Sequence, residues 1–262
     1  MIYQHIAVQK GPVATVRLCR PQVRNAMDDK TLVEIAAAFK ALSKSKDLRA
    51  VIVRGDGPDF CAGADINWMR RAGRMKPAQS RKDAALLLTM CLAVESCPVP
   101  VLALLHGGVY GGGLGLAAAC DIVIAEENAR MCFSECRLGI IPAVISCFVI
   151  PKIGAAQARR YYLTGEVFDM ETARHLGIVH EIAPQGDVEA RAQAAVKNIL
   201  KNGPNAVREA KALLRKFPNL SFERRAKLVL DTLTRLRRSP EGQEGLSAFL
   251  EKRPAAWIEA AA

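Results

Sequence analysis

The residues best suited to chemistry lie in a glycine-rich turn between two apolar runs. Five glycines fall within residues 107–113, after the apolar run 99–105 and before the small-residue segment 114–120. This order predicts a strand, a turn, a helix and a second strand, with the glycines where the helix begins. Glycine lets a backbone come close to a ligand, and a helix start has unpaired N–H groups at the positive end of its dipole. The turn therefore suits an oxyanion or a phosphate.

The same turn does not match two common nucleotide-binding loops. No Gly-Lys-Ser/Thr sequence follows it, as an ATPase phosphate loop requires. The acidic residue expected after the second strand of a dinucleotide-binding unit is also missing.

A second candidate is the small-residue loop Phe-Cys-Ala-Gly-Ala-Asp-Ile at residues 60–66. It follows a predicted strand and leads into a predicted helix, which Asp65 is able to cap. The Ala and Gly residues of this loop can offer backbone N–H groups to a ligand. Short Ala/Gly turns are common, so the loop alone is weak evidence of a site.

A third candidate is Glu135, a carboxylate among apolar neighbours in residues 133–142. Burial would raise its pKa and equip it for acid–base work. An exposed ion pair between Glu135 and Arg137 explains the same spacing equally well.

The surrounding elements alternate in type, which indicates an α/β core with βαβ crossovers. Residues 5–9 and 13–19 form a predicted hairpin, and 49–54 and 178–182 are predicted strands. Predicted helices cover residues 28–43, 80–96, 154–163 and 170–175. From Asp187 onward the pattern is helical, at about 187–201, 204–216, 221–237 and 240–250. We place a soft boundary between core and helical tail near residues 184–186.

Composition narrows the class of protein. The chain has 262 residues, half of them hydrophobic, which suffices for a substantial core. Nine of its eleven net positive charges lie in residues 197–238, which fits either an anionic partner or a solvated helical face. Eight cysteines without a CxxC pair favour buried reduced thiols over disulfides or zinc. No apolar run reaches membrane-spanning length and no leader is recognisable, so we expect a cytoplasmic protein without a membrane partner.

Taken together, the three candidate segments resemble the enoyl-CoA hydratase/isomerase (crotonase) superfamily. The resemblance rests on the loop 61–66, the glycine turn ending in Cys120-Asp121, and Glu135 shortly before Leu-Gly-Ile-Ile-Pro. It runs nearly end to end and includes Arg-Pro-Gln-Val-Arg-Asn-Ala-Met at 20–27.

This resemblance implies a fold and an assembly. The fold is an α/β crotonase (ClpP-like) spiral of ββα units in residues 1–185, with a C-terminal α-helical oligomerisation region in 186–262. The assembly is a homotrimer or a dimer of trimers. Members bind acyl-CoA thioesters without a metal or redox cofactor, so none is expected here, and CoA is part of the substrate.

The resemblance also implies site residues. The backbone N–H groups of Ala62 and Gly112 would form an oxyanion hole for the thioester oxygen, and Glu135 falls on the acidic catalytic position. Fixed N–H donors stabilise the enolate charge that builds up on that oxygen. The implied substrate- and CoA-binding residues are Arg24, Asn25, Ala26, Ala62, Gly63, Ala64, Asp65, Gly112 and Trp68.

One position departs from the family pattern. Hydratases of this superfamily usually carry a second glutamate three residues after the oxyanion glycine, and here that residue is Gly115. Three explanations stay open: Glu135 acts alone, another carboxylate such as one on the substrate substitutes, or the reaction is an isomerisation. Segments 63–69, 134–146, 158–169 and 239–257 look most similar to bacterial 3-methylglutaconyl-CoA hydratases of leucine degradation and to their isohexenylglutaconyl-CoA relatives. Such substrates carry a distal carboxylate, for which Arg70, Arg71, Arg74 and Arg137 are the candidate partners.

The sequence therefore predicts a hydro-lyase that hydrates a carboxylated 2-enoyl-CoA. An enoyl-CoA isomerase and a general short-chain enoyl-CoA hydratase are the enzymatic alternatives. A non-enzymatic alternative is an RNA-binding module built on the basic C-terminal helices. No aromatic stacking platform accompanies those charges, which disfavours nucleic acid as a partner.

Overall fold

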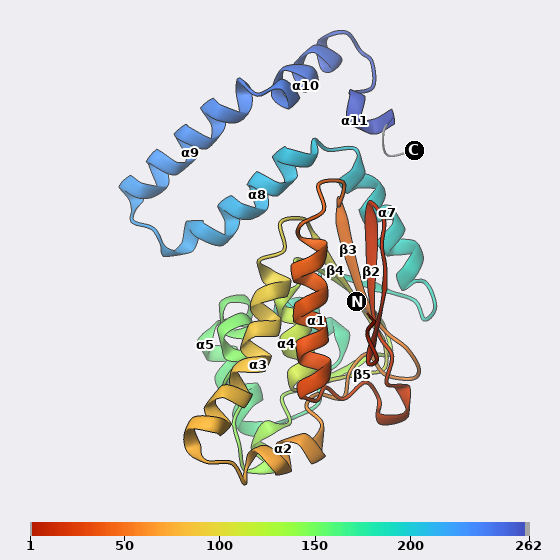
Figure 1. The fold of residues 1–262 in the computed structure, drawn as a ribbon, viewed down its shortest axis with the longest axis vertical. Helices are drawn as coiled ribbons and strands as arrows, with labels where there is room; N and C mark the ends of the chain where they lie inside the picture. The colour runs from red at the N-terminus through yellow and green to blue at the C-terminus, as the bar shows by residue number, and fades with distance from the viewer. Residues whose placement is uncertain (1, 260–262) are drawn as a thin grey trace.

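A six-stranded sheet forms the centre of the protein in the computed structural model, which describes residues 2–259 (Figure 1). Its strand order is β1-β2-β3-β4-β6-β8, and every neighbouring pair except β1 and β2 is parallel. The strands are β1 (Ile6–Gln9), β2 (Val13–Leu18), β3 (Ala50–Gly55), β4 (Val101–Leu105), β6 (Ile122–Glu126) and β8 (Glu181–Ala183). A second, two-stranded parallel sheet pairs β5 (Gly108–Tyr110) with β7 (Arg130–Cys132).

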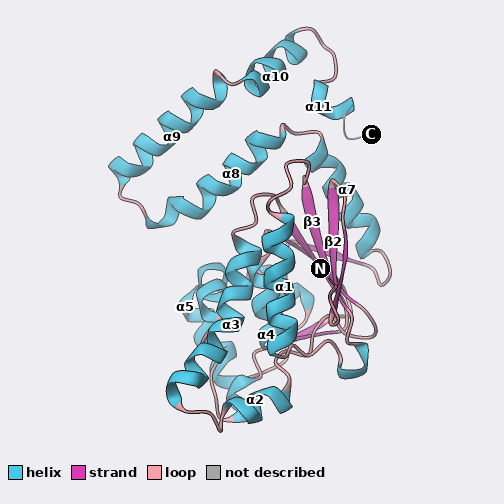
Figure 2. Cartoon of the chain, in the orientation of Figure 1, coloured by secondary structure: helices cyan, strands magenta, loops and turns pink. Residues whose placement is uncertain are grey.

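Helices cover both faces of the main sheet, which explains why its central strand β4 is apolar and buried at every residue. Val51 and Val53 belong to the larger core cluster, together with buried residues of α1 (Asp29–Leu42) and α3 (Pro77–Glu95). Figure 2 shows these two helices beside the sheet. The alternate residue Ile52 belongs to a second cluster, with buried residues of α7 (Val188–Leu200). The predicted α/β class with a C-terminal helical region is confirmed.

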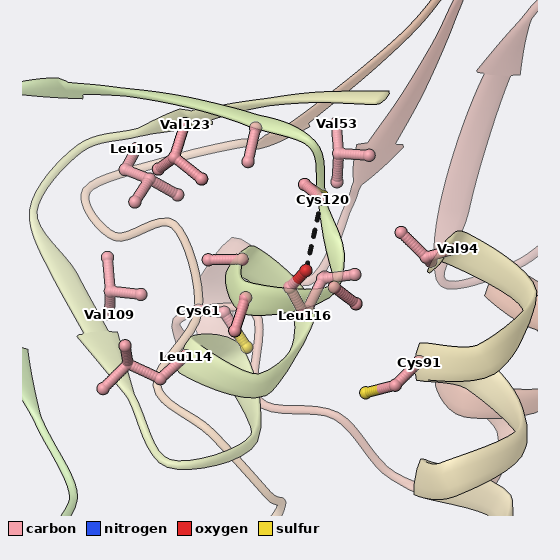
Figure 3. Packing of buried hydrophobic residues seen from close by; sticks show 14 of the residues in the cluster. Val53, Cys61, Cys91, Val94, Leu105, Val109, Leu114, Leu116, Cys120 and Val123 are labelled. Atoms are coloured by element: carbon pink, nitrogen blue, oxygen red, sulfur yellow. Dashed lines mark hydrogen bonds between the residues drawn. The ribbon is translucent and has the colours of Figure 1, made fainter. Parts of the chain in front are cut away.

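The helix after the glycine turn, α4 (Gly112–Ala119), is buried at every residue. Figure 3 shows it surrounded by side chains from β3, β4, β6 and α3, with Cys61 of the small-residue loop beside it. A Cβ atom on Gly113 would lie 2.7 Å from the Cys61 carbonyl oxygen. Only glycine allows the loop and the helix to approach so closely at this position.

Several elements differ from the sequence prediction. The glycine turn contains the short strand β5, which pairs with β7 and which no sequence pattern predicted. Residues predicted as an apolar segment and a short helix form α5 (Ser146–Thr164), where Pro151 and Gly154 (φ 73°) interrupt the helical geometry. The hairpin and α6 (Met170–His175) were predicted correctly.

The C-terminal helices extend away from the sheet as an arm, the blue part of Figure 1. They are α8 (Pro204–Lys216), α9 (Phe222–Arg237), α10 (Pro240–Leu250) and α11 (Ala256–Glu259), and the first three match the predicted spans closely. Because α7 packs on the sheet, the helices that leave the core begin at α8, downstream of the boundary predicted near residue 185.

Part of the positive charge of this arm fastens it to the core. Arg208 donates to three backbone carbonyls after α1, and Lys211 forms a 2.5 Å ion pair with Asp121. These cations are occupied by the fold and are not a free anion-binding surface.

Five of the eight cysteines are buried and Cys147 is exposed, and all eight are free thiols. Within residues 2–259, no helix is both long and apolar enough to cross a bilayer. No cluster of three or more His, Cys, Asp or Glu side chains suited to a metal ion occurs in the described part of the chain.

Candidate active site

A cavity of about 630 Å³ lies where the three candidate segments meet. Its walls are the loop 62–64, the start of α4, the segment 134–145, and the helices α2 (Ile66–Ala72) and α3. Most of its lining is apolar and includes Ile66, Met69, Leu87, Ile140 and Val144. A long, mostly apolar ligand fits such a surface.

In the loop, the N–H group that can serve a ligand belongs to Ala64 and not to Ala62. The Ala62 N–H donates to the Arg24 carbonyl at 2.9 Å, so the prediction of Ala62 as an oxyanion donor is wrong. The Gly63 N–H faces Cys61 Sγ, and the Asp65 N–H donates to the Met27 carbonyl. The Ala64 N–H has no acceptor within residues 2–259, and Ala64 lines the cavity.

Gly112 supplies a second N–H group next to that of Ala64. It is the first residue of α4, and its N–H also finds no acceptor in the described residues. A Cβ atom on Gly112 would lie 3.7 Å from the Ala64 nitrogen, so the two backbones are in contact. Gly63 (φ 97°) permits this contact, since a Cβ there would lie 2.9 Å from the Tyr110 carbonyl oxygen.

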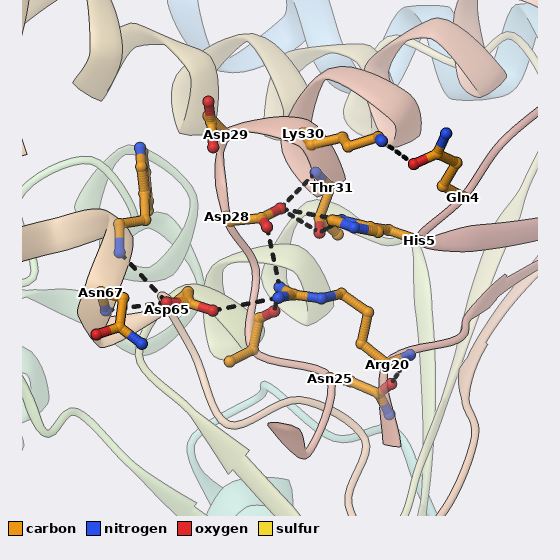
Figure 4. A network of polar contacts seen from close by, with 12 residues as sticks. Gln4, His5, Arg20, Asn25, Asp28, Asp29, Lys30, Thr31, Asp65 and Asn67 are labelled. Atoms are coloured by element: carbon orange, nitrogen blue, oxygen red, sulfur yellow. Dashed lines mark hydrogen bonds and ion pairs between the residues drawn. The ribbon is translucent and has the colours of Figure 1, made fainter. Parts of the chain in front are cut away.

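A polar network holds the loop in place (Figure 4). The Arg20 guanidinium lies 3.3 Å from Asp65 and 3.4 Å from Asp28, and it also donates to the Ala26 carbonyl. Asp65 caps α2 by accepting from two backbone N–H groups, as the sequence predicted, and Asp28 caps α1 by accepting from the Thr31 backbone N–H. One arginine thus ties two helix starts together immediately beside Ala64.

Glu135 lines the same cavity, and one of its carboxylate oxygens has no hydrogen-bond partner in the described structure. It begins the short helix η2 (Glu135–Leu138), and its Oε1 would lie 3.1 Å from a Cβ atom on Gly111. Its Oε2 is buried and has no hydrogen-bond partner in the described structure. Burial raises the pKa of the Glu135 carboxyl. The exposed ion pair with Arg137 does not form among the described contacts, so the acid–base interpretation is favoured.

Comparison with known proteins matches this arrangement to one family. The family described as enoyl-CoA hydratase/isomerase matches residues 9–260. The chain is 30% identical to the crotonyl-CoA hydratase of Syntrophomonas wolfei, over 98% of this chain and 99% of that protein. The chain belongs to the enoyl-CoA hydratase/isomerase family.

Solved structures share the whole fold with this chain. An enoyl-CoA hydratase from Shewanella pealeana is 36% identical with a TM-score of 0.92, over 97% of this chain and 96% of that one. Pseudomonas aeruginosa AtuE is 32% identical with a TM-score of 0.94, over 97% of this chain and 100% of that one.

Four residues predicted to contact CoA lie outside the cavity lining: Arg24, Asn25, Ala26 and Asp65, of which Asp65 caps α2 and pairs with Arg20. The buried Asn25 amide accepts a hydrogen bond from the Arg20 backbone N–H and donates to the Asp56 and Asp59 carbonyls. Its side chain therefore stabilises the fold. The Ala26 carbonyl is occupied by Arg20. The Arg24 side chain is 70% exposed and forms a 3.5 Å ion pair with Asp59. The Arg24 carbonyl accepts a hydrogen bond from the Ala62 N–H, so Arg24 lies beside the loop 60–66. Arg24 therefore remains the predicted phosphate contact.

Among the other predicted residues, Trp68 lines the cavity while most of its ring is buried. It donates at 2.9 Å to Asp83, a cavity residue on α3 that sequence patterns did not single out. Of the four arginines predicted to meet a distal carboxylate, Arg137 lines the cavity. Arg71 instead pairs with Asp29 at 3.5 Å.

Proposed function

We propose that this protein hydrates the double bond of a 2-enoyl-CoA. Three groups on one cavity support the reaction: the N–H groups of Ala64 and Gly112, and the Glu135 carboxylate. The two N–H groups would bind the thioester oxygen, where enolate charge develops when water adds at C3. Glu135 would take a proton from that water and deliver a proton to C2. The observation that carries the proposal is the pair of adjacent N–H groups on the same cavity as an unpartnered, buried carboxylate oxygen.

The substrate class we propose carries a distal carboxylate, as 3-methylglutaconyl-CoA and isohexenylglutaconyl-CoA do. Arg137 supports this, because it lines the cavity and forms no ion pair among the described residues. Because Arg137 lies two residues after Glu135 in η2, a distal carboxylate bound to Arg137 would stay near the double bond on which Glu135 acts.

We further propose that the protein works as a homotrimer or a dimer of trimers in the cytoplasm. The arm supports assembly, because it exposes large apolar side chains that a monomer would leave in water. These are Leu214, Phe222, Leu230, Leu233, Phe249 and Leu250, all more than half exposed.

Isomerisation is a second candidate, and Gly115 favours it. A single carboxylate suffices to move a proton from C2 to C4 of a 3-enoyl-CoA, because the proton it takes is the one it returns. Position 115 offers no second carboxylate.

The test is a panel of crotonyl-CoA, 3-methylglutaconyl-CoA and a 3-enoyl-CoA, assayed with wild type and Glu135→Gln. We expect the wild type to hydrate the glutaconyl substrate and Glu135→Gln to lose that activity. Double-bond migration without hydration would replace the proposal by the isomerase, and no turnover of any acyl-CoA would contradict both.

A further inference from the structure

The space beside Gly115 is filled by the side chain of Ile145. A Cβ atom on Gly115 would overlap the Ile145 Cγ2 methyl group and lie 3.0 Å from Ile145 Cβ. Ile145 is 1% exposed, so it has little room to move aside. Any side chain at position 115 therefore has to displace Ile145.

Position 115 lies one helical turn away from a residue that contacts Glu135. Gly115 lies one helical turn after Gly111, to whose carbonyl its N–H donates, and a Cβ on Gly111 would contact the Glu135 carboxylate. Ile145 lines the same cavity as Glu135 and lies on the same connecting segment. A longer side chain at position 115 would therefore have to pass Ile145 to reach the cavity that Glu135 lines.

We propose that Ile145 is a specificity-determining residue that keeps a second carboxylate from reaching Glu135 through position 115. This proposal rests on the proposed function, and it explains a substrate preference within it. In hydration, the oxygen of water bonds to C3, one proton of water goes to a base, and a proton is added to C2. Because Ile145 excludes a second acidic side chain, Glu135 has to perform both proton transfers. Help with ordering the water then has to come from the substrate, whose own distal carboxylate can supply it.

The consequence is selectivity against substrates with plain acyl chains. Crotonyl-CoA has no distal carboxylate, and Asp83, the other carboxylate that lines the cavity, already accepts a hydrogen bond from the Trp68 indole, so Glu135 has to act alone. An engineered site with a glutamate at position 115 would relieve this dependence, provided that Ile145 is made smaller.

The first test is steric and independent of activity. Gly115→Glu is introduced into wild type and into Ile145→Ala, and thermal midpoints of all four proteins are measured as a double-mutant cycle. We expect Gly115→Glu to lower the midpoint by about 5 °C in wild type, and by less than about 2 °C when Ile145 is alanine. Equal losses in both backgrounds would overturn the proposal.

The second test compares Gly115→Glu/Ile145→Ala with its matched control Gly115→Gln/Ile145→Ala, which has the same shape without the carboxylate. We expect crotonyl-CoA hydration to be at least about tenfold faster in the glutamate protein, since a general acid or base contributes that much or more. Equal rates in the two proteins would contradict the proposed role of Ile145. If the wild type is active on the glutaconyl substrate, the proposed function would still stand. A wild type that turns over no acyl-CoA would instead contradict the proposed function, and the thermal cycle would still decide the steric claim.

Discussion

The two N–H groups of the site are positioned by opposite means. Ala64 sits beside a polar network in which Arg20 joins two aspartates that cap helices. Gly112 begins a helix that is buried at every residue and packed through glycines against the loop. Charge fixes one half of the site, and close packing fixes the other.

Asp65 and Glu135, the acidic residues near these two N–H groups, differ in how their oxygens are satisfied. Asp65 accepts two backbone hydrogen bonds and lies against Arg20, so its oxygens are occupied. Glu135 has an oxygen with no described partner, and its pKa is raised by burial. A carboxylate satisfied by the fold stabilises the loop, whereas an unsatisfied one is available for proton transfer. The four predictions below test this difference in order of expected effect.

The close packing of α4 against the loop 60–66 should not tolerate an added side chain. Gly113→Ala would place a Cβ 2.7 Å from the Cys61 carbonyl oxygen and 2.8 Å from Cys61 Cβ, both in the loop it packs on. We expect loss of measurable turnover and about 3 kcal/mol of lost stability in urea unfolding. Gly11→Ala is the control, because its Cβ would meet nothing closer than 3.4 Å. Near-normal activity of Gly113→Ala would show that the packing is not tight.

Glu135→Gln should separate activity from stability. We expect turnover to fall about 10²- to 10⁴-fold, since the group that moves the proton is lost. Because burial raises the pKa of Glu135, the folded state binds its proton more strongly than the unfolded state does. Wild-type stability should therefore decrease, relative to Glu135→Gln, as pH rises from 4 to 8. Urea unfolding across that range measures the difference, and a difference that does not change with pH would contradict a buried carboxylate.

The polar half should weaken when its cation is removed. Arg20→Gln leaves the mostly buried Asp28 and Asp65 carboxylates without their shared partner, at a cost of about 3 kcal/mol. We expect kcat to drop on the order of tenfold, with a smaller change in KM, because the Ala64 donor loses its alignment. Arg71→Gln, which removes an exposed ion pair nearby, is the control. Equal effects of the two substitutions would argue against alignment by Arg20.

Asp65→Asn should have the smallest effect. Asparagine still caps a helix, so α2 keeps its start while the ion pair with Arg20 is lost. We expect a stability loss of about 1 kcal/mol and activity within about threefold of wild type. A loss of stability and activity as large as that of Arg20→Gln would show that Asp65, rather than Arg20, is the residue on which the loop depends.

Sequence patterns predicted the fold and most of the site, because local signals specify helix starts and glycine turns. Asp28, Asp65 and Pro204 mark helix starts that the structure confirms. The error at Ala62 has a physical reason: in an Ala-Gly-Ala loop, the N–H that stays unpaired depends on pairing with the distant Arg24 and Met27 backbones. Ile145 gave no signal for the same reason, since its contact with Gly115 exists only in the folded chain.

The most direct test of the account is the vibrational spectrum of a 2-enoyl-CoA bound to Glu135→Gln, which binds without turnover. If the N–H groups of Ala64 and Gly112 bind the thioester oxygen, the carbonyl stretch should shift to lower frequency than in water, because two fixed donors weaken that bond. A carbonyl band at or above its frequency in water would contradict the assignment of these two N–H groups.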